Sequence, residues 1–99
     1  MANLHGTEIS FRLGPGTADE ARDIAGRLAA AAAGARRHVL FLDAERGEYG
    51  CLAEWGRPEQ AEAYAALPAV ARELEALEAR TGTPARVRRY VMEETPPGA

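Results

Sequence analysis

Apolar and polar residues alternate along several short stretches of this 99-residue chain, which is the pattern of half-buried β-strands. In residues 7–13 one side of the extended chain carries Ile9, Phe11 and Leu13, and polar residues fill the positions between them. The other stretches of this kind are residues 37–43, 48–55 and 85–93. Residues 45–47 predict a tight turn, so the second and third stretches are expected to form a hairpin.

Between these stretches, apolar residues recur at the three-to-four-residue spacing of amphipathic helices. Thr17 and Glu20 form a capping-box pattern that opens the first helix. The second helix is predicted from Pro58 to Arg80, bent or interrupted before Pro68. The glycines expected to end the two helices are Gly34 and Gly82. The residues expected to face the core are Ala21, Ile24, Leu28 and Ala32 in the first helix and Tyr64, Leu67, Ala71, Leu74 and Leu77 in the second.

The predicted order is strand, helix, two strands, helix and strand, which is the split βαβ arrangement of ferredoxin-like domains. We therefore expect an α+β fold with βαββαβ topology and a four-stranded antiparallel sheet. Residues 1–94 would form a single domain. Residues 95–99, which include Pro96 and Pro97, are expected to form a disordered tail.

Apolar residues occupy both sides of two predicted strands. Two helices can cover only one face of a four-stranded sheet, yet the other face would carry Val39, Phe41, Tyr90 and Met92. Leaving such side chains in water costs about 1.5 to 3 kcal/mol each, which in sum rivals the stability of a small domain. We therefore predict a homodimer in which the two sheets face each other.

The charge balance excludes some classes of partner. Twelve basic and 15 acidic residues give a formal net charge of −3, which disfavours nucleic acid. Residues 46–50 partly match the strand motif of RNA-recognition modules, but Glu48 interrupts it and Cys51 replaces the stacking aromatic residue. No stretch approaches the ~20 apolar residues of a membrane span, and no cleavable leader is recognisable. One cysteine cannot form an internal disulfide, so we expect a cytoplasmic protein with no nucleic-acid or membrane partner.

The strand-to-helix junction in residues 49–68 carries the most informative motif. Glu54 and Trp55 end the strand, and an alanine-rich helix with Ala61, Tyr64 and Pro68 follows. This segment resembles the antibiotic biosynthesis monooxygenase family, in which a Glu-Trp pair leads into an alanine-rich helix with a histidine and, four residues later, a proline. Tyr64 stands where many members have the histidine. The resemblance implies a dimeric α+β barrel, and the family mixes cofactor-free oxygenases, haem-degrading enzymes and proteins with no known activity.

In that family the substrate cavity lies between helices and sheet, and the residues that match its lining are Trp55 and Tyr64. Oxidation of an electron-rich phenol or anthrone by O2 requires an apolar pocket that excludes water and a hydrogen-bond donor for the forming phenolate. The predicted catalytic residues are Trp55 and Tyr64 as donors and His38 as a base near neutral pH. The predicted substrate-binding residues are Arg12 and Arg37, for an anionic oxygen, and Phe11, Leu40, Cys51 and Leu67, as an apolar lining.

Each of these candidates also has a purely structural interpretation. Trp55 can close one end of the core, and Tyr64 can belong to the apolar stripe of its helix. His38 can be a polar residue at a strand end, and Cys51 a buried thiol. The alternative function is therefore a non-catalytic, dimeric small-molecule-binding or regulatory protein of the same fold.

Metal and haem chemistry have little support in the sequence. The histidines and the cysteine show no metal-ligand spacing, so we predict neither a metal nor a cofactor. Ser10 and Arg12 stand on the strand where haem-degrading relatives use an asparagine, and Tyr64 replaces the histidine. In the last strand Arg89 points opposite to Arg86 and Arg88, and one of the three is a candidate to line a pocket or to pair across the dimer.

Overall fold

In the part of the chain that the structure describes, four antiparallel strands form one sheet in the order β2-β3-β1-β4. The computed structural model describes residues 3–98. Its strands are β1 (Leu4–Arg12), β2 (Arg37–Asp43), β3 (Glu48–Trp55) and β4 (Arg86–Met92). β1 starts earlier than the alternation predicts, because residues 4–6 continue the ladders to β3 and β4. The predicted hairpin is confirmed, since the Gly47 amide donates to the Asp43 carbonyl at 2.8 Å.

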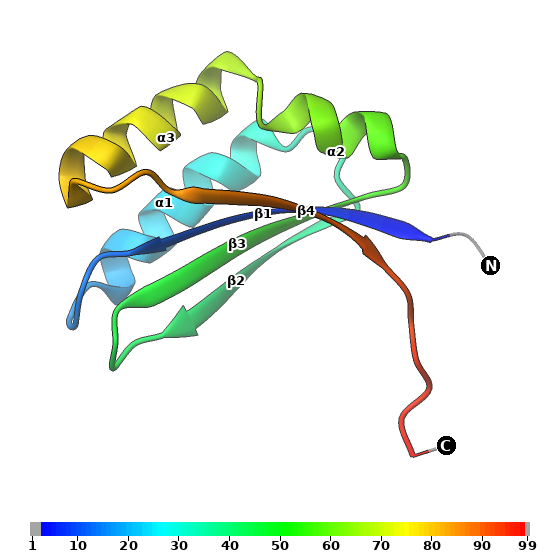
Figure 1. Ribbon diagram of the computed structural model, residues 1–99, viewed down its shortest axis with the longest axis horizontal. Helices are drawn as coiled ribbons and strands as arrows, with labels where there is room; N and C mark the ends of the chain where they lie inside the picture. The colour runs from blue at the N-terminus through cyan, green and yellow to red at the C-terminus, as the bar shows by residue number, and fades with distance from the viewer. Residues whose placement is uncertain (1–2, 99) are drawn as a thin grey trace.

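The three helices of residues 3–98 lie on one face of this sheet, as Figure 1 shows. They are α1 (Ala18–Ala31), α2 (Pro58–Tyr64) and α3 (Pro68–Thr81). The interruption before Pro68 is confirmed: Leu67 is extended, with ψ of 138°, as expected for a residue that precedes proline. Gly82 ends α3 in the left-handed region, with φ of 78°. The ferredoxin-like α+β fold predicted from the sequence is therefore confirmed, with the second helix divided in two.

Two local predictions are wrong. The Thr17 hydroxyl does not cap α1, because it donates to the Gly14 carbonyl at 2.6 Å and lies 2.9 Å from the Tyr49 hydroxyl. Leu67 does not face the core, since it is 38% exposed, whereas Val70 is fully buried. The extended residue Leu67 separates α2 from α3, so the three-to-four-residue spacing of buried positions does not continue from one helix into the next. The buried residues are Ala61 and Tyr64 in α2 and Val70 and Leu77 in α3.

The core lies between the helices and the near face of the sheet. The predicted stripe of α1 is confirmed, since Ala21, Ile24, Leu28 and Ala32 are buried. They belong to one core cluster with Ile9, Cys51 and Ala53 of the strands and Leu77 of α3. Leu40 lies opposite the buried Cys51 and Val87 opposite the buried Ile9, so both point to the helix side of the sheet. Successive side chains alternate, so Val39, Phe41, Tyr90 and Met92 point to the far face, which is the face away from the helices, as predicted. Phe41 and Tyr90 are 48% and 36% exposed there. Residues 93–98 follow β4 without regular structure and are exposed, and Ala99, the end of the predicted tail, lies outside the described residues.

Candidate functional site

The end of β3 and the start of α2 bring Trp55 and Tyr64 together. Gly56 and Arg57 turn the chain between the two elements, and Pro58 occupies the first turn of α2, where its missing N–H is not needed. The rings of Trp55 and Tyr64 have centroids 5.2 Å apart and planes inclined by 53°. Both side chains are buried, with 3% and 2% exposed. The sequence spacing placed the indole and the phenol at one junction, and the structure puts them in contact.

The Trp55 indole carries an unused hydrogen-bond donor. Within the described part of the chain, its Nε1 has no hydrogen-bond partner although the atom is buried. An indole N–H can only donate, and leaving a buried donor unpaired costs about 1 to 3 kcal/mol. An oxygen atom of a bound molecule that reached Nε1 would remove this cost.

The hydroxyl of Tyr64, in contrast, is already engaged. It donates to the Leu28 carbonyl at 2.8 Å. Leu28 lies in the last turn of α1. In a continued helix its carbonyl would accept from the Ala32 amide, but that amide donates to the Ala29 carbonyl. The Tyr64 hydroxyl therefore supplies the hydrogen bond that the Leu28 carbonyl would otherwise lack. Burial, with a smaller contribution from Cys51, raises the pKa of Tyr64 to about 12. Near neutral pH this residue is therefore a neutral donor and not a base.

His38 and Cys51 lie on the same face of the sheet as Trp55. His38 pairs with Ala53 across the ladder, is partly buried, and has its pKa lowered by burial. It is thus an uncharged imidazole able to accept a proton near neutral pH. Burial, with a smaller contribution from Glu8, raises the pKa of the Cys51 thiol to about 12, so the sulfur is no thiolate. Leu40 packs opposite Cys51 as part of this apolar wall.

Four predicted substrate-binding residues do not gather at the indole. Phe11 pairs with Tyr49 at the other end of the sheet, about 20 Å along the strand from Trp55. Arg12 and Arg37 lie on the far face, because alternation turns them away from the helices. Leu67 is exposed between α2 and α3.

Arg37 has a different role from the one expected. Its guanidinium binds the Glu54 carboxylate, whose side chain is only 7% exposed. This hydrogen bond, and the charge of Glu54, raise the pKa of Arg37. The Glu54 of the sequence motif therefore pairs across the β2–β3 ladder on the face opposite to Trp55.

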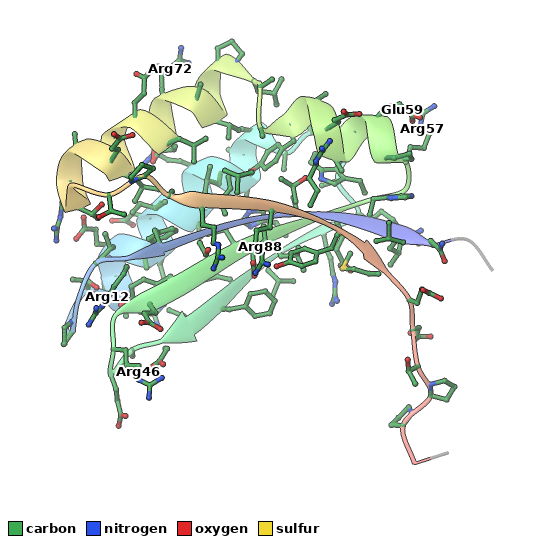
Figure 2. The ribbon with its side chains drawn as sticks, in the orientation of Figure 1. Arg12, Arg46, Arg57, Glu59, Arg72 and Arg88 are labelled. Atoms are coloured by element: carbon green, nitrogen blue, oxygen red, sulfur yellow. The ribbon has the colours of Figure 1, made fainter. Side chains whose placement is uncertain are left out.

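Sequence reasoning did not assign Arg89 to this neighbourhood. Arg89 pairs with Thr7 across the β1–β4 ladder, on the helix side, and its Nη1 lies 3.1 Å from Glu62 of α2. The Thr7 hydroxyl in turn donates to the Ala61 carbonyl at 2.8 Å. The only signal in the sequence is the alternation that separates Arg89 from Arg86 and Arg88. Figure 2 shows Arg88 on the side of the sheet away from the helices.

Several solved structures of other proteins are similar to this chain in fold. SnoaB, a cofactor-independent oxygenase from Streptomyces nogalater, has a TM-score of 0.66 and 18% identity over 97% of this chain and 96% of its own. Two candidate antibiotic biosynthesis monooxygenases are also similar. The protein from Chloroflexus aurantiacus has a TM-score of 0.65 and 19% identity over 93% of this chain and 95% of its own. The protein from Nitrosomonas europaea has a TM-score of 0.71 and 8% identity over 93% of this chain and 92% of its own.

This chain has the antibiotic biosynthesis monooxygenase fold. No protein-family model and no curated protein matches the sequence, so the likeness is one of fold. A shared fold does not fix a shared reaction, and function must be argued from the Trp55 site.

Two further observations concern the described residues. Nowhere in residues 3–98 do three or more His, Cys, Asp or Glu side chains gather as a group that could hold a metal ion. None of the helices described is long and apolar enough to span a membrane.

Replacing Tyr64 with phenylalanine is expected to lower the free energy of unfolding by about 1 to 3 kcal/mol, because the buried Leu28 carbonyl loses its donor. The folded-state pKa of Tyr64, about 12, exceeds its ordinary value of 10.0. The associated stability is therefore fully present below pH 10 and is lost as the pH rises towards 12. We expect the stability of the variant to fall less steeply than that of the wild type across this range.

Urea unfolding followed by circular dichroism at several pH values measures both effects. Tyr90→Phe is the matched control, since it removes an exposed hydroxyl bonded to Glu8 and is expected to change stability little. Equal unfolding curves for the Tyr64 variant and the wild type would contradict the role given to this hydroxyl.

Proposed function

We propose that this protein binds a hydrophobic aromatic molecule of the phenol or anthrone type against Trp55 and catalyses its cofactor-independent monooxygenation. The buried, unpartnered indole Nε1 carries this proposal. It is a donor of fixed orientation in an apolar surrounding, as stabilisation of a phenolate or enolate oxygen requires. The oxygenase fold adds support.

The reaction needs no electron source other than the substrate. When O2 oxidises the methylene carbon of an anthrone to a carbonyl, one oxygen atom enters the product. The other leaves as water with the two methylene hydrogens. Removing a proton first gives an enolate, whose oxygen accepts the hydrogen bond from Trp55. His38, whose lowered pKa keeps it neutral, is our candidate to take that proton.

The proposed assembly is a homodimer in which two sheets face each other. The far face carries Val39, Phe41, Leu52, Tyr90 and Met92, and Phe41 and Tyr90 are 48% and 36% exposed in the single chain. A second copy of the chain would remove this apolar surface from water at a gain of about 25 cal/mol per Å². The predicted cytoplasmic location stays a prediction.

One observation favours a non-catalytic binding or regulatory protein as the second candidate. The Tyr64 hydroxyl is committed to Leu28, and the pKa values of Tyr64 and Cys51 are both about 12. Of the four residues Trp55, Tyr64, His38 and Cys51, His38 is thus the one that can accept a proton near neutral pH. A substrate that does not reach His38 would be bound but not turned over.

Oxygen uptake by the metal-stripped protein tests the proposed reaction. A panel of anthrones and hydroxynaphthalenes is expected to give protein-dependent uptake, and Trp55→Phe is expected to lower kcat on the order of 100-fold, because one oxyanion donor is lost. Arg72→Gln, which changes an exposed side chain of α3 outside the pocket and the far face, serves as the control and is expected to retain the rate.

The outcomes separate the two candidates. Unchanged turnover in the Trp55→Phe protein would remove the indole from the reaction. Binding of panel members without oxygen uptake by the folded wild type would favour the non-catalytic alternative.

A further inference from the structure

We propose that a pocket between α2 and β4 binds the carboxylate of a small aromatic acid, with Arg89 as the anion-binding residue. The proposal rests on the proposed function in one respect: it makes this pocket the side from which a ligand approaches Trp55. It adds the charge of the ligand and the residue that selects for it.

The pocket exists because the helices do not fully cover β4, the edge strand of the sheet. Val87 and Val91 point to the helix side and yet are 38% and 61% exposed. Beneath α2 this edge leaves a cavity of about 240 Å³, lined by His5, Pro58, Ala61, Glu62, Arg89, Tyr90 and Val91. This volume lies just below the usual range of small-molecule sites, about 300 to 1,000 Å³, so a ligand of one or two rings fits.

Arg89 supplies a positive charge to a pocket that is otherwise lined by apolar residues, His5, Tyr90 and the acidic Glu62. Its partner Glu62 lies 3.1 Å away, but both side chains are mostly exposed, at 58% and 68%. Exposed ion pairs contribute little to stability, so a ligand carboxylate can replace Glu62 without a large loss. The planar guanidinium can then bind both carboxylate oxygens.

The other exposed arginine pairs are less able to receive a ligand. Arg27 binds both carboxylate oxygens of Glu73 through Nε, at 2.7 and 3.0 Å. Arg80 makes two hydrogen bonds to Glu20, at 3.1 and 3.2 Å. Arg27 and Arg80 also line a pocket, between α1 and α3, but there the two carboxylates already occupy the positions that a ligand would need, whereas Arg89 and Glu62 meet only as an ion pair.

The inner wall of the pocket is one residue away from the indole. His5 pairs with Val91 on one side and with Trp55 on the other, and alternation turns all three to the helix side. Directly opposite residues in an antiparallel ladder have Cβ atoms about 5 Å apart. Ala61, with its small side chain, closes the wall above Thr7. A ring held against Pro58, Ala61 and Val91 with its carboxylate on Arg89 therefore lies beside His5, next to Trp55.

Titration of 2-naphthoate, followed by ¹H–¹⁵N correlation spectra, tests this site. Trp55 is the only tryptophan in the chain, so the single indole N–H signal reports on it. We expect 2-naphthoate to shift this signal and the amides of His5 and Val91. The neutral 2-naphthamide is expected to bind at least 10-fold more weakly.

Substitutions of Arg89 and Glu62 test whether Arg89 recognises the carboxylate of 2-naphthoate. Arg89→Gln is expected to weaken 2-naphthoate at least 10-fold and to leave 2-naphthamide unchanged, while Glu62→Gln is expected to strengthen 2-naphthoate a few-fold by removing the competing carboxylate. Arg80→Gln is the matched control, because it removes an exposed, paired arginine elsewhere, and should bind like the wild type. Arg89→Lys keeps the positive charge but loses the planar guanidinium that binds two oxygens, so its affinity for 2-naphthoate should lie between those of the wild type and Arg89→Gln.

Equal affinity of wild type and Arg89→Gln for 2-naphthoate would overturn the proposal, as would shifts confined to residues away from β4 and α2. No binding to the wild type at millimolar 2-naphthoate would also overturn it. These readouts require no oxygen chemistry. Arg89-dependent binding without oxygen uptake would support this site and reject the proposed oxygenase reaction. Oxygen uptake that is the same in the wild type and in Arg89→Gln would support the oxygenase reaction and reject this site.

Discussion

Replacement of Gly47 by alanine is expected to lower the free energy of unfolding by about 3 kcal/mol or more. A Cβ atom at this position would lie 1.8 Å from the carbonyl oxygen of Gly14, which is a backbone atom and cannot move aside alone. The φ of Gly47 is +68°, a conformation that side chains disfavour. Its carbonyl also accepts from the amides of Leu13 and Gly14, at 2.8 and 3.3 Å, so the β2–β3 turn is fixed against the end of β1.

Gly26→Ala provides the matched control. Gly26 lies exposed within α1, and a Cβ atom there would meet nothing within 4 Å. Alanine should therefore raise the free energy of unfolding by about 0.5 to 1 kcal/mol, through helix propensity. Urea unfolding of both variants measures the difference, and similar small effects for the two would show that the Gly14–Gly47 contact does not constrain the turn.

Phe41→Asp is expected to weaken the proposed dimer by more than 100-fold and to leave a folded monomer. Phe41 lies on the far face of the sheet, 48% exposed, against Gly50 of β3. In a dimer with facing sheets the new carboxylate would be buried without a partner, at a cost of several kcal/mol. In the single chain it would remain solvated, so the protomer should still fold.

Sedimentation equilibrium measures this effect. We expect twice the chain mass of 10.6 kDa for the wild type at micromolar concentration and the chain mass for the variant. Ala69→Asp adds the same charge at an exposed position in the first turn of α3, where an acidic residue is tolerated, and should stay dimeric. A wild type that sediments at the chain mass would reject the proposed assembly.

The candidate site shows where sequence reasoning succeeds and where it stops. The spacing between Trp55 and Tyr64 predicted that both lie at one strand-to-helix junction, and their rings are 5.2 Å apart. Arg12 and Arg37 were predicted beside them for their charge, but the pairing of Arg37 with Glu54 and the alternation of β1 place both on the far face. The alternation in β4 singled out Arg89 without indicating that Glu62 would stand next to it.

The sequence by itself determined the elements whose signal is local. The bounds of β2 and β3, the stop at Gly82 and the break before Pro68 all follow from alternation or backbone chemistry within a few residues. Tertiary structure alone decided which polar groups meet. Tyr64 donates to a carbonyl 36 residues away, and Thr17 gives up its capping role for the Gly14 carbonyl and the Tyr49 hydroxyl. Such contacts depend on how strands and helices pack, because neighbours in the sequence carry no information about the atom that a side chain reaches across the core.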